Sequence, residues 1–176
     1  MSAQSNLAQS QAPASKPFVI SRTFAAPRDV VFEAWTSLEG VKNWMGPKGM
    51  NVVKATSDFR PGGHIHYLLR MADGKEMWGK WTYREIKKPE HIVAVVAFTD
   101  ETGEKIVPHP LAPDWPLESL SRCEFTEING ITTVTVTWEP IDPTPAQQKM
   151  FDAGHEGMTA GWTGSLDKLE EYLAKL

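Results

Sequence analysis

The sequence has little cysteine and no long apolar run, and neither sign of charge dominates it. Cys123 is the single cysteine among 176 residues, so no disulfide can form within the chain, and we expect Cys123 to be a small structural residue. Lysine and arginine number 18 against 22 aspartate and glutamate residues, for a formal net charge of −4. This balance argues against a nucleic-acid partner and against capture by an anionic membrane, since both need a basic face. No apolar run approaches the roughly 20 residues that span a bilayer, and we expect a cytoplasmic protein.

The common catalytic and cofactor-binding motifs are also missing. The sequence contains no Gly-x-Ser-x-Gly elbow, no phosphate-binding glycine loop and no His-Glu-x-x-His helix. His64 and His66 share one face of an expected strand, which suits metal ligands, but no Cys, Asp or Glu cluster completes a site. We therefore expect no metal and no cofactor, and a hydrolase is disfavoured.

The chain begins with a segment whose composition differs from the rest. Residues 1–16 are rich in serine, glutamine and alanine and lack the basic start and hydrophobic core of a signal peptide. We expect a disordered tail there, followed by one domain over residues 17–176. Hydrophobic residues make up 41% of the sequence, enough for a sizeable core in a domain of this length.

A strand and two short helices are expected after the tail. Residues 18–24 are rich in β-branched and aromatic side chains and predict a strand. Pro27 suits the first turn of a helix, whose apolar residues recur at helical spacing up to Trp35. A second short helix is expected over about residues 38–44, ending before a Gly-Pro pair.

Between residues 50 and 140 the pattern changes to strand-like runs separated by turn signals. Asn129-Gly130 is the strongest short-range hairpin signal among them. Sequential strands joined by short turns predict an antiparallel meander. The expected strands cover residues 50–59, 64–71, 76–86, 91–99, 117–128 and 131–139.

The last segment has the pattern of one long helix. Thr144 can cap its N-terminus with Pro145 at the first helical position, and residues 145–174 would span roughly 45 Å. Its apolar stripe must be buried, and the meander is the only large surface available. The stripe comprises Phe151, His155, Met158, Trp162, Leu166, Leu169 and Leu173. We predict an α+β fold: a curved antiparallel sheet of about seven strands wraps around a long C-terminal helix, with two short helices after the first strand.

Four stretches, in order and at suitable spacing, carry a resemblance to a known family. Residues 26–36 resemble the family's first-helix signature, and Trp44-Met45-Gly46-Pro47 resembles its Trp-x-Gly-Pro turn. Residues 58–63 resemble its Asp-x-Arg-x-Gly-Gly hairpin, and residues 156–169 resemble its terminal-helix signature. On these stretches the chain resembles the SRPBCC or START-like superfamily. More narrowly, it resembles the bacterial single-domain relatives of the C-terminal domain of the activator of heat-shock protein 90 ATPase.

The resemblance implies a helix-grip fold with a cavity between the sheet and the terminal helix. Relatives bind lipids, hormones or polyketides, some cyclise polyketides, and one branch assists a chaperone. We expect this chain to bind a small, largely apolar molecule; the alternatives are a cyclase- or aromatase-like enzyme and a chaperone-assisting protein. From the faces of the expected strands and helix, the cavity would be lined by Tyr67, Leu69, Met71, Phe98, Val134, Val136, Trp138, Phe151, His155, Met158 and Trp162.

His155 and the connection over residues 100–116 are the two features that point to a more specific role. A histidine in an apolar wall can orient a ligand or act as an acid or base; the alternative is a core histidine satisfied by a neighbour. The connection is rich in proline and longer than a hairpin requires, and long ordered connections often serve as binding loops or lids. Leu111 and Trp115 are therefore candidate lid residues, with an ordinary surface loop as the alternative.

Two pairs of residues make the expected register testable. Trp78 and Trp81 fall on opposite faces of one strand, so one should line the cavity and the other should lie outside. Asp58 and Arg60 share a strand face just before a glycine pair and should form a salt bridge that stabilises the turn.

Overall fold

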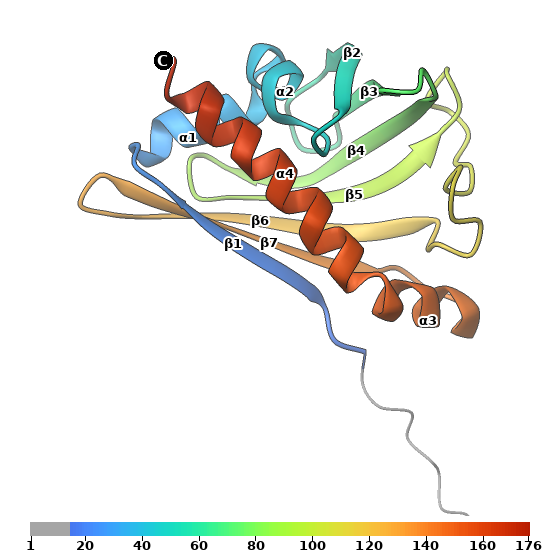
Figure 1. Cartoon of the computed structure of the whole chain (residues 1–176). Helices are drawn as coiled ribbons and strands as arrows, with labels where there is room; N and C mark the ends of the chain where they lie inside the picture. Colours follow the sequence, from blue (N-terminus) through green and yellow to red (C-terminus); the bar gives the residue numbers. More distant parts are fainter. Residues whose placement is uncertain (1–14) are drawn as a thin grey trace, which may run out of the picture.

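The computed structural model describes residues 15–176 and arranges them as a curved sheet with helices packed on one face (Figure 1). Most of the expected tail lies outside the described residues. At Ser15 the chain already contacts its C-terminal part, because the Gln148 side-chain amide donates to Ser15 Oγ at 2.5 Å.

The elements occur in the predicted order, apart from a break in the last helix. They are β1 (Phe18–Phe24), α1 (Arg28–Thr36), α2 (Leu38–Trp44), β2 (Met50–Ser57), β3 (His64–Met71), β4 (Glu76–Lys87), β5 (His91–Thr99), β6 (Glu118–Ile128), β7 (Ile131–Pro140), α3 (Pro145–Ala153) and α4 (His155–Leu173).

All strand pairs are antiparallel, in the order β1-β7-β6-β5-β4-β3-β2. Strands β2 to β7 are therefore the predicted meander, and β1 forms an edge of the sheet by pairing with β7. Figure 1 shows α4 running across the face of this sheet, with α1 and α2 packed beside its C-terminal end. The predicted helix-grip architecture, with about seven strands and two short helices after the first, is confirmed.

Strand β2 ends two residues earlier than predicted, because the chain turns at Asp58. The Arg60 amide donates to Asp58 O at 3.0 Å, and the Gly63 amide donates to Arg60 O at 2.8 Å. The predicted salt bridge is present, with Arg60 Nη2 2.9 Å from Asp58 Oδ2. The other strands agree with their predicted ends to within one residue.

The C-terminal segment is not one continuous helix, as predicted, but two. The predicted cap at Thr144 is present, since Thr144 Oγ1 accepts from the Gln147 amide at 3.2 Å. The break falls at Gly154, a residue type that weakens helices. A side chain does not fit at Gly154, because Trp115 Cζ3 lies 2.6 Å from the place that a Cβ would occupy. Figure 1 shows α3 turned away from the axis of α4.

Burial alternates as predicted along β4, β6 and β7, whereas β5 is buried on both faces. On β3, Ile65 and Tyr67 are buried whereas Arg70 is exposed. On β4, Trp81 is the inner tryptophan, with 6% of its surface exposed, and Trp78 lies on the outer face. The helices therefore cover the apolar face of the sheet, where the core lies.

Candidate functional site

A cavity of about 500 Å³ lies between the sheet, α4 and two loops. Its walls come from β3, β4 and β5, from one face of α4, from the loop between α2 and β2, and from the connection between β5 and β6. Ligand pockets in proteins typically occupy about 300–1,000 Å³, so this space has the size of a small-molecule site. Its lining is mostly aromatic, aliphatic or methionine.

The sheet side of the cavity depends on a glycine between two aromatic residues. Gly79 on β4 pairs with Tyr67 on β3 and with Phe98 on β5. A Cβ on Gly79 would lie 2.5 Å from Tyr67 Cζ, so the tyrosine ring covers the glycine backbone. Trp81 Nε1 donates to the Tyr67 hydroxyl oxygen at 3.2 Å. Burial raises the pKa of Tyr67 to about 12, so the phenol is neutral at physiological pH.

Helix α4 supplies a facing wall of aromatic and small residues. Trp162 lies parallel to Trp35 with ring centroids 6.0 Å apart, and Trp138 meets it edge-on at 5.8 Å. One turn earlier, Gly157 also borders the cavity, and a Cβ there would have no atom within 4 Å. The missing side chain at Gly157 therefore leaves open space beside the aromatic wall.

The connection between β5 and β6 covers another side of the cavity. Leu111 and Trp115, the two candidate lid residues, both line it, together with His109 and Ala112. The connection is tied to the sheet where the Val107 amide donates to Phe98 O at 2.9 Å. The connection therefore borders the cavity, and its action as a lid stays a prediction.

His109 is a lining residue that the sequence reasoning did not single out. It lies between prolines in a segment without periodicity, so no pattern indicated which way its ring faces. The ring meets Phe98 edge-on with centroids 4.5 Å apart. Burial lowers the pKa of His109, which favours the neutral imidazole.

The loop between α2 and β2 is attached to α4 by one lysine. Lys168 Nζ donates to three backbone oxygens: Met45 O at 3.2 Å, Gly46 O at 2.9 Å and Met50 O at 3.0 Å. Burial lowers the pKa of Lys168, and the negative charge of Glu171 partly opposes this shift. Because Met45, Gly46 and Met50 line the cavity, Lys168 holds one of its walls in place.

Replacing Lys168 by methionine should lower the free energy of unfolding by about 2 kcal/mol, because three carbonyls lose a charged donor in a half-buried position. Urea unfolding followed by tryptophan fluorescence measures this loss. Lys175→Met, at an exposed position near the C-terminus, is the matched control and should change stability by less than about 0.5 kcal/mol. Equal effects of the two variants would contradict the role given to Lys168.

The structure places the eleven predicted cavity residues in two groups. The first group lines the cavity: Tyr67, Leu69, Phe98, Trp138, Met158 and Trp162. The second does not border it: Met71, Val134, Val136, Phe151 and His155. The two valines are buried in the core, and Met71 packs against the core at the end of β3. Phe151 and His155 lie near the break at Gly154, so the stripe does not continue as one straight face.

His155 therefore lies outside the cavity, contrary to the prediction. Its ring lies between Phe18 on β1 and Phe151 on α3, with centroids 5.7 Å and 5.1 Å away. Its Nε2 is buried without a hydrogen-bond partner among residues 15–176. The alternative of a core histidine satisfied by a neighbour stays a prediction.

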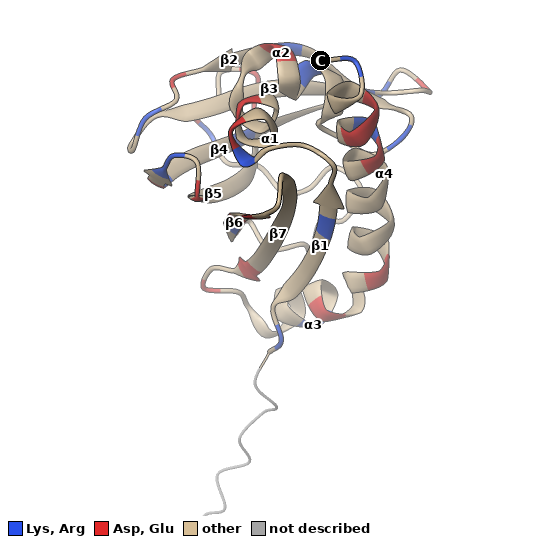
Figure 2. Cartoon of the chain, turned by 90° about the vertical axis from the view of Figure 1, so that its left-hand side faces the viewer, with Lys and Arg blue, Asp and Glu red and all other residues tan. Residues whose placement is uncertain are grey.

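Among residues 15–176, no charged side chain borders the cavity. Figure 2 shows lysine, arginine, aspartate and glutamate scattered along the elements, with acidic residues on α3 and α4.

His64 and His66 are on the outer face of β3, where His66 stacks on Trp78 with centroids 4.6 Å apart. Within residues 15–176, no three His, Cys, Asp or Glu side chains gather as a metal site would require. Cys123 is buried, and burial raises the pKa of its thiol to about 12.

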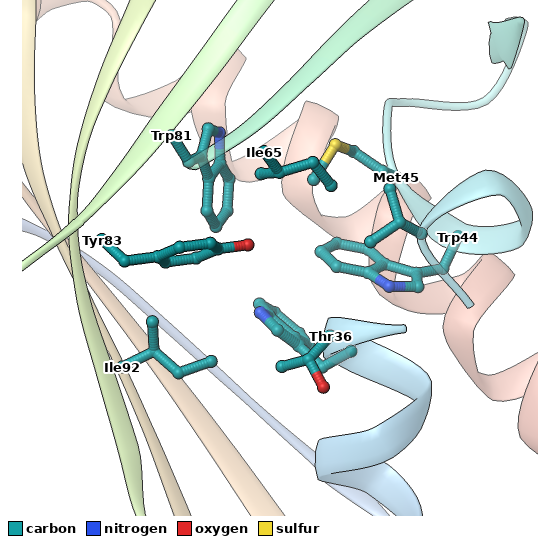
Figure 3. Close-up of a pocket in the computed structure, with 9 residues that line it drawn as sticks. Thr36, Trp44, Met45, Ile65, Trp81, Tyr83 and Ile92 are labelled. Atoms are coloured by element: carbon teal, nitrogen blue, oxygen red, sulfur yellow. The ribbon is translucent and has the colours of Figure 1, made fainter. Parts of the chain in front are cut away.

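A second space, of about 10 Å³, adjoins the cavity (Figure 3). Trp44, Met45 and Trp81 border both spaces. Figure 3 shows the hydroxyl of Tyr83 directed toward Trp44. A volume of roughly 10–15 Å³ holds one water molecule, so this space is too small for an organic ligand. The larger cavity is the candidate site.

Comparisons with known proteins place this geometry in a family. No curated protein matches the sequence. A solved protein from Nitrosomonas europaea is 21% identical with a TM-score of 0.74, covering 93% of this chain and 97% of that chain. One from Arthrobacter aurescens is 20% identical with a TM-score of 0.76, covering 92% and 88%. The AHSA1 protein from Silicibacter pomeroyi is 19% identical with a TM-score of 0.68, covering 90% and 98%.

At these identities the solved structures establish the fold alone. No helix among the described residues is long and apolar enough to cross a membrane. The family model described as "Activator of Hsp90 ATPase homolog 1-like protein" matches residues 25–174. Because this match covers most of the chain, the chain belongs to the family of Activator of Hsp90 ATPase homolog 1-like proteins.

Proposed function

We propose that this protein binds a small, largely apolar molecule in the cavity between its sheet and α4. The observation that carries the proposal is an uncharged, mostly apolar cavity of about 500 Å³, bordered by aromatic rings from α2, α4, four strands and the connection between β5 and β6. Burial of apolar ligand surface contributes roughly 25 cal/mol per Å² before ordering costs. The START-like fold of the family supports the same function.

Two measurements test the proposal. Native mass spectra of protein purified from its own host should show a retained mass that disappears on denaturation. A titration with N-phenyl-1-naphthylamine, which fluoresces in apolar surroundings, should saturate at one probe per chain. An apo mass together with an unsaturable, weak fluorescence response would contradict the proposal.

The alternative of a cyclase-like enzyme predicts a polar pair inside the cavity, such as His155 beside a carboxylate or a tyrosine. His155 does not border the cavity, and the cavity lining contains no carboxylate.

The chaperone-assisting alternative predicts apolar residues gathered on the outer surface. Ile128 and Ile131, 76% and 51% exposed at the β6–β7 turn, fit it. Two side chains are a small part of the roughly 800 Å² that each partner buries in a stable complex, so ligand binding is preferred.

The variant His155→Phe tests whether His155 takes part in ligand binding or only packs in the core. Phenylalanine keeps the contacts with Phe18 and Phe151 and removes a buried nitrogen that has no partner, so the free energy of unfolding should rise by about 1 kcal/mol. The affinity for N-phenyl-1-naphthylamine should not change. A large loss of affinity in a variant that folds normally would instead mean that His155 takes part in binding.

A further inference from the structure

The chemistry of the cavity lining restricts what the ligand can be. Only two of its side chains, Tyr67 and His109, can titrate, and the lining holds no carboxylate, ammonium or guanidinium. A charged ligand would lose its hydration without gaining a counter-ion, at a cost of several kcal/mol. A neutral ligand is therefore favoured, and its orientation depends on polar groups of the lining.

His109 has one ring nitrogen engaged and one free. The Leu111 amide donates to His109 Nδ1 at 3.0 Å, so Nδ1 is an acceptor. In a neutral imidazole the other nitrogen, Nε2, then carries the hydrogen. Within residues 15–176 no group accepts a hydrogen bond from Nε2. Burial favours this neutral form, because it disfavours the imidazolium.

Three other polar side chains of the lining already have a contact or are enclosed. The Tyr67 hydroxyl already accepts from Trp81 Nε1 at 3.2 Å. The Ser165 hydroxyl donates to Gly161 O within α4, at 3.2 Å. Trp138 Nε1 is enclosed by protein atoms and is not accessible from the cavity. The Tyr67 O–H and the indole N–H groups of Trp115 and Trp162 are further donors of the lining. His109 Nε2–H differs from them because the contact at Nδ1 fixes the tautomer that places its hydrogen.

We propose that the ligand is a neutral apolar molecule with an acceptor oxygen, such as a ketone or ester carbonyl, and that His109 Nε2–H donates to that oxygen. The inference rests on the proposed function and adds the chemical class of the ligand. It makes His109, not His155, the residue that sets specificity. The turn at Leu111 holds the tautomer that the donation requires.

Two probes of similar shape test the inference: 2-acetylnaphthalene, which carries a carbonyl, and 2-ethylnaphthalene, which does not. Calorimetric or fluorescence titration gives the affinity ratio between them for each variant. Asparagine and glutamine divide the two functions of His109, because an Asn oxygen can replace Nδ1 and a Gln amide N–H can replace Nε2–H. His109→Asn should lower the affinity for the ketone by about fivefold to tenfold relative to the affinity for the hydrocarbon. His109→Gln should retain most of the preference for the ketone.

The outcomes separate this inference from the function on which it rests. If both probes bind the natural protein but neither variant changes their affinity ratio, the inference is wrong and the binding function stands. If Asn keeps the preference and Gln loses it, His109 acts only through the turn, and the inference is again wrong. If neither probe binds the natural protein, the binding function and the inference both fail.

A measurement on the natural protein covers the case in which a variant does not fold. The ¹⁵N resonance of His109 Nε2 should shift when 2-acetylnaphthalene is added and should move much less with 2-ethylnaphthalene. Equal responses to the two probes would overturn the inference without any substitution.

Discussion

Replacing Gly157 by tryptophan is expected to weaken binding of N-phenyl-1-naphthylamine by about 100-fold, because an indole that displaces about 100 Å² of buried ligand surface removes about 2.5 kcal/mol. Gly157 borders the cavity, and no atom lies within 4 Å of the place where its Cβ would be. Gly157 is exposed, so the new side chain meets no protein atom at its Cβ and should occupy the edge of the cavity. Glycine is a poor helix former, so the variant should be at least as stable as the natural protein.

Ala160→Trp is the matched control for this prediction. Ala160 is exposed on the same helix and does not border the cavity, so an indole there should leave probe affinity unchanged. Fluorescence titration gives both affinities, and thermal unfolding checks both folds. Unchanged affinity in a folded Gly157→Trp protein would mean that the probe binds elsewhere.

Gly79→Ala should lower the free energy of unfolding by about 3 kcal/mol, the upper part of the range for overpacked cores. A methyl group on Gly79 would lie 2.5 Å from both Cζ and the hydroxyl oxygen of Tyr67. The ring is buried and stiff, so it must leave the glycine and move into the cavity. This movement also breaks the hydrogen bond from Trp81 Nε1. Urea unfolding measures the stability loss, and probe affinity should fall with it.

A double-mutant cycle identifies the cause of that loss. In a Tyr67→Ala background the ring is absent, so adding Gly79→Ala should cost less than about 1 kcal/mol. The difference between the two backgrounds measures the conflict between the methyl group and the ring. Equal costs in both backgrounds would place the strain elsewhere in the sheet.

The sheet was predictable because its strands carry a simple period. Alternation put Tyr67 and Leu69 on the inner face of β3, and the structure places both on the cavity. Short turns between the runs indicated an antiparallel meander, so the order of six strands followed directly. Capping chemistry was equally local, as Thr144 shows.

The errors arose where tertiary contacts decide the outcome. Helical spacing placed His155 on the same face as Trp162. It does not reveal the break in the helix at Gly154, where Trp115 from the β5–β6 connection packs. His109 was missed because its orientation depends on a turn with Leu111, not on a period. Val134 and Val136 share the inner face with cavity residues, yet they are packed in the core. Alternation predicts which face of the sheet a side chain lies on, but it does not predict whether that side chain borders a cavity.

The glycines around the cavity differ in how freely they can change. At Gly79 and Gly154 any side chain meets an aromatic ring at 2.5–2.6 Å, so both positions are closed to substitution without repacking. At Gly157 the space is open, and at Gly161 a Cβ would meet only Pro47 Cγ, at 3.4 Å. If the proposed binding function holds, single substitutions at these two positions of α4 change the size of ligand that the cavity accepts. New ligand preferences can evolve there gradually, one methyl or methylene group at a time, while the scaffold remains intact.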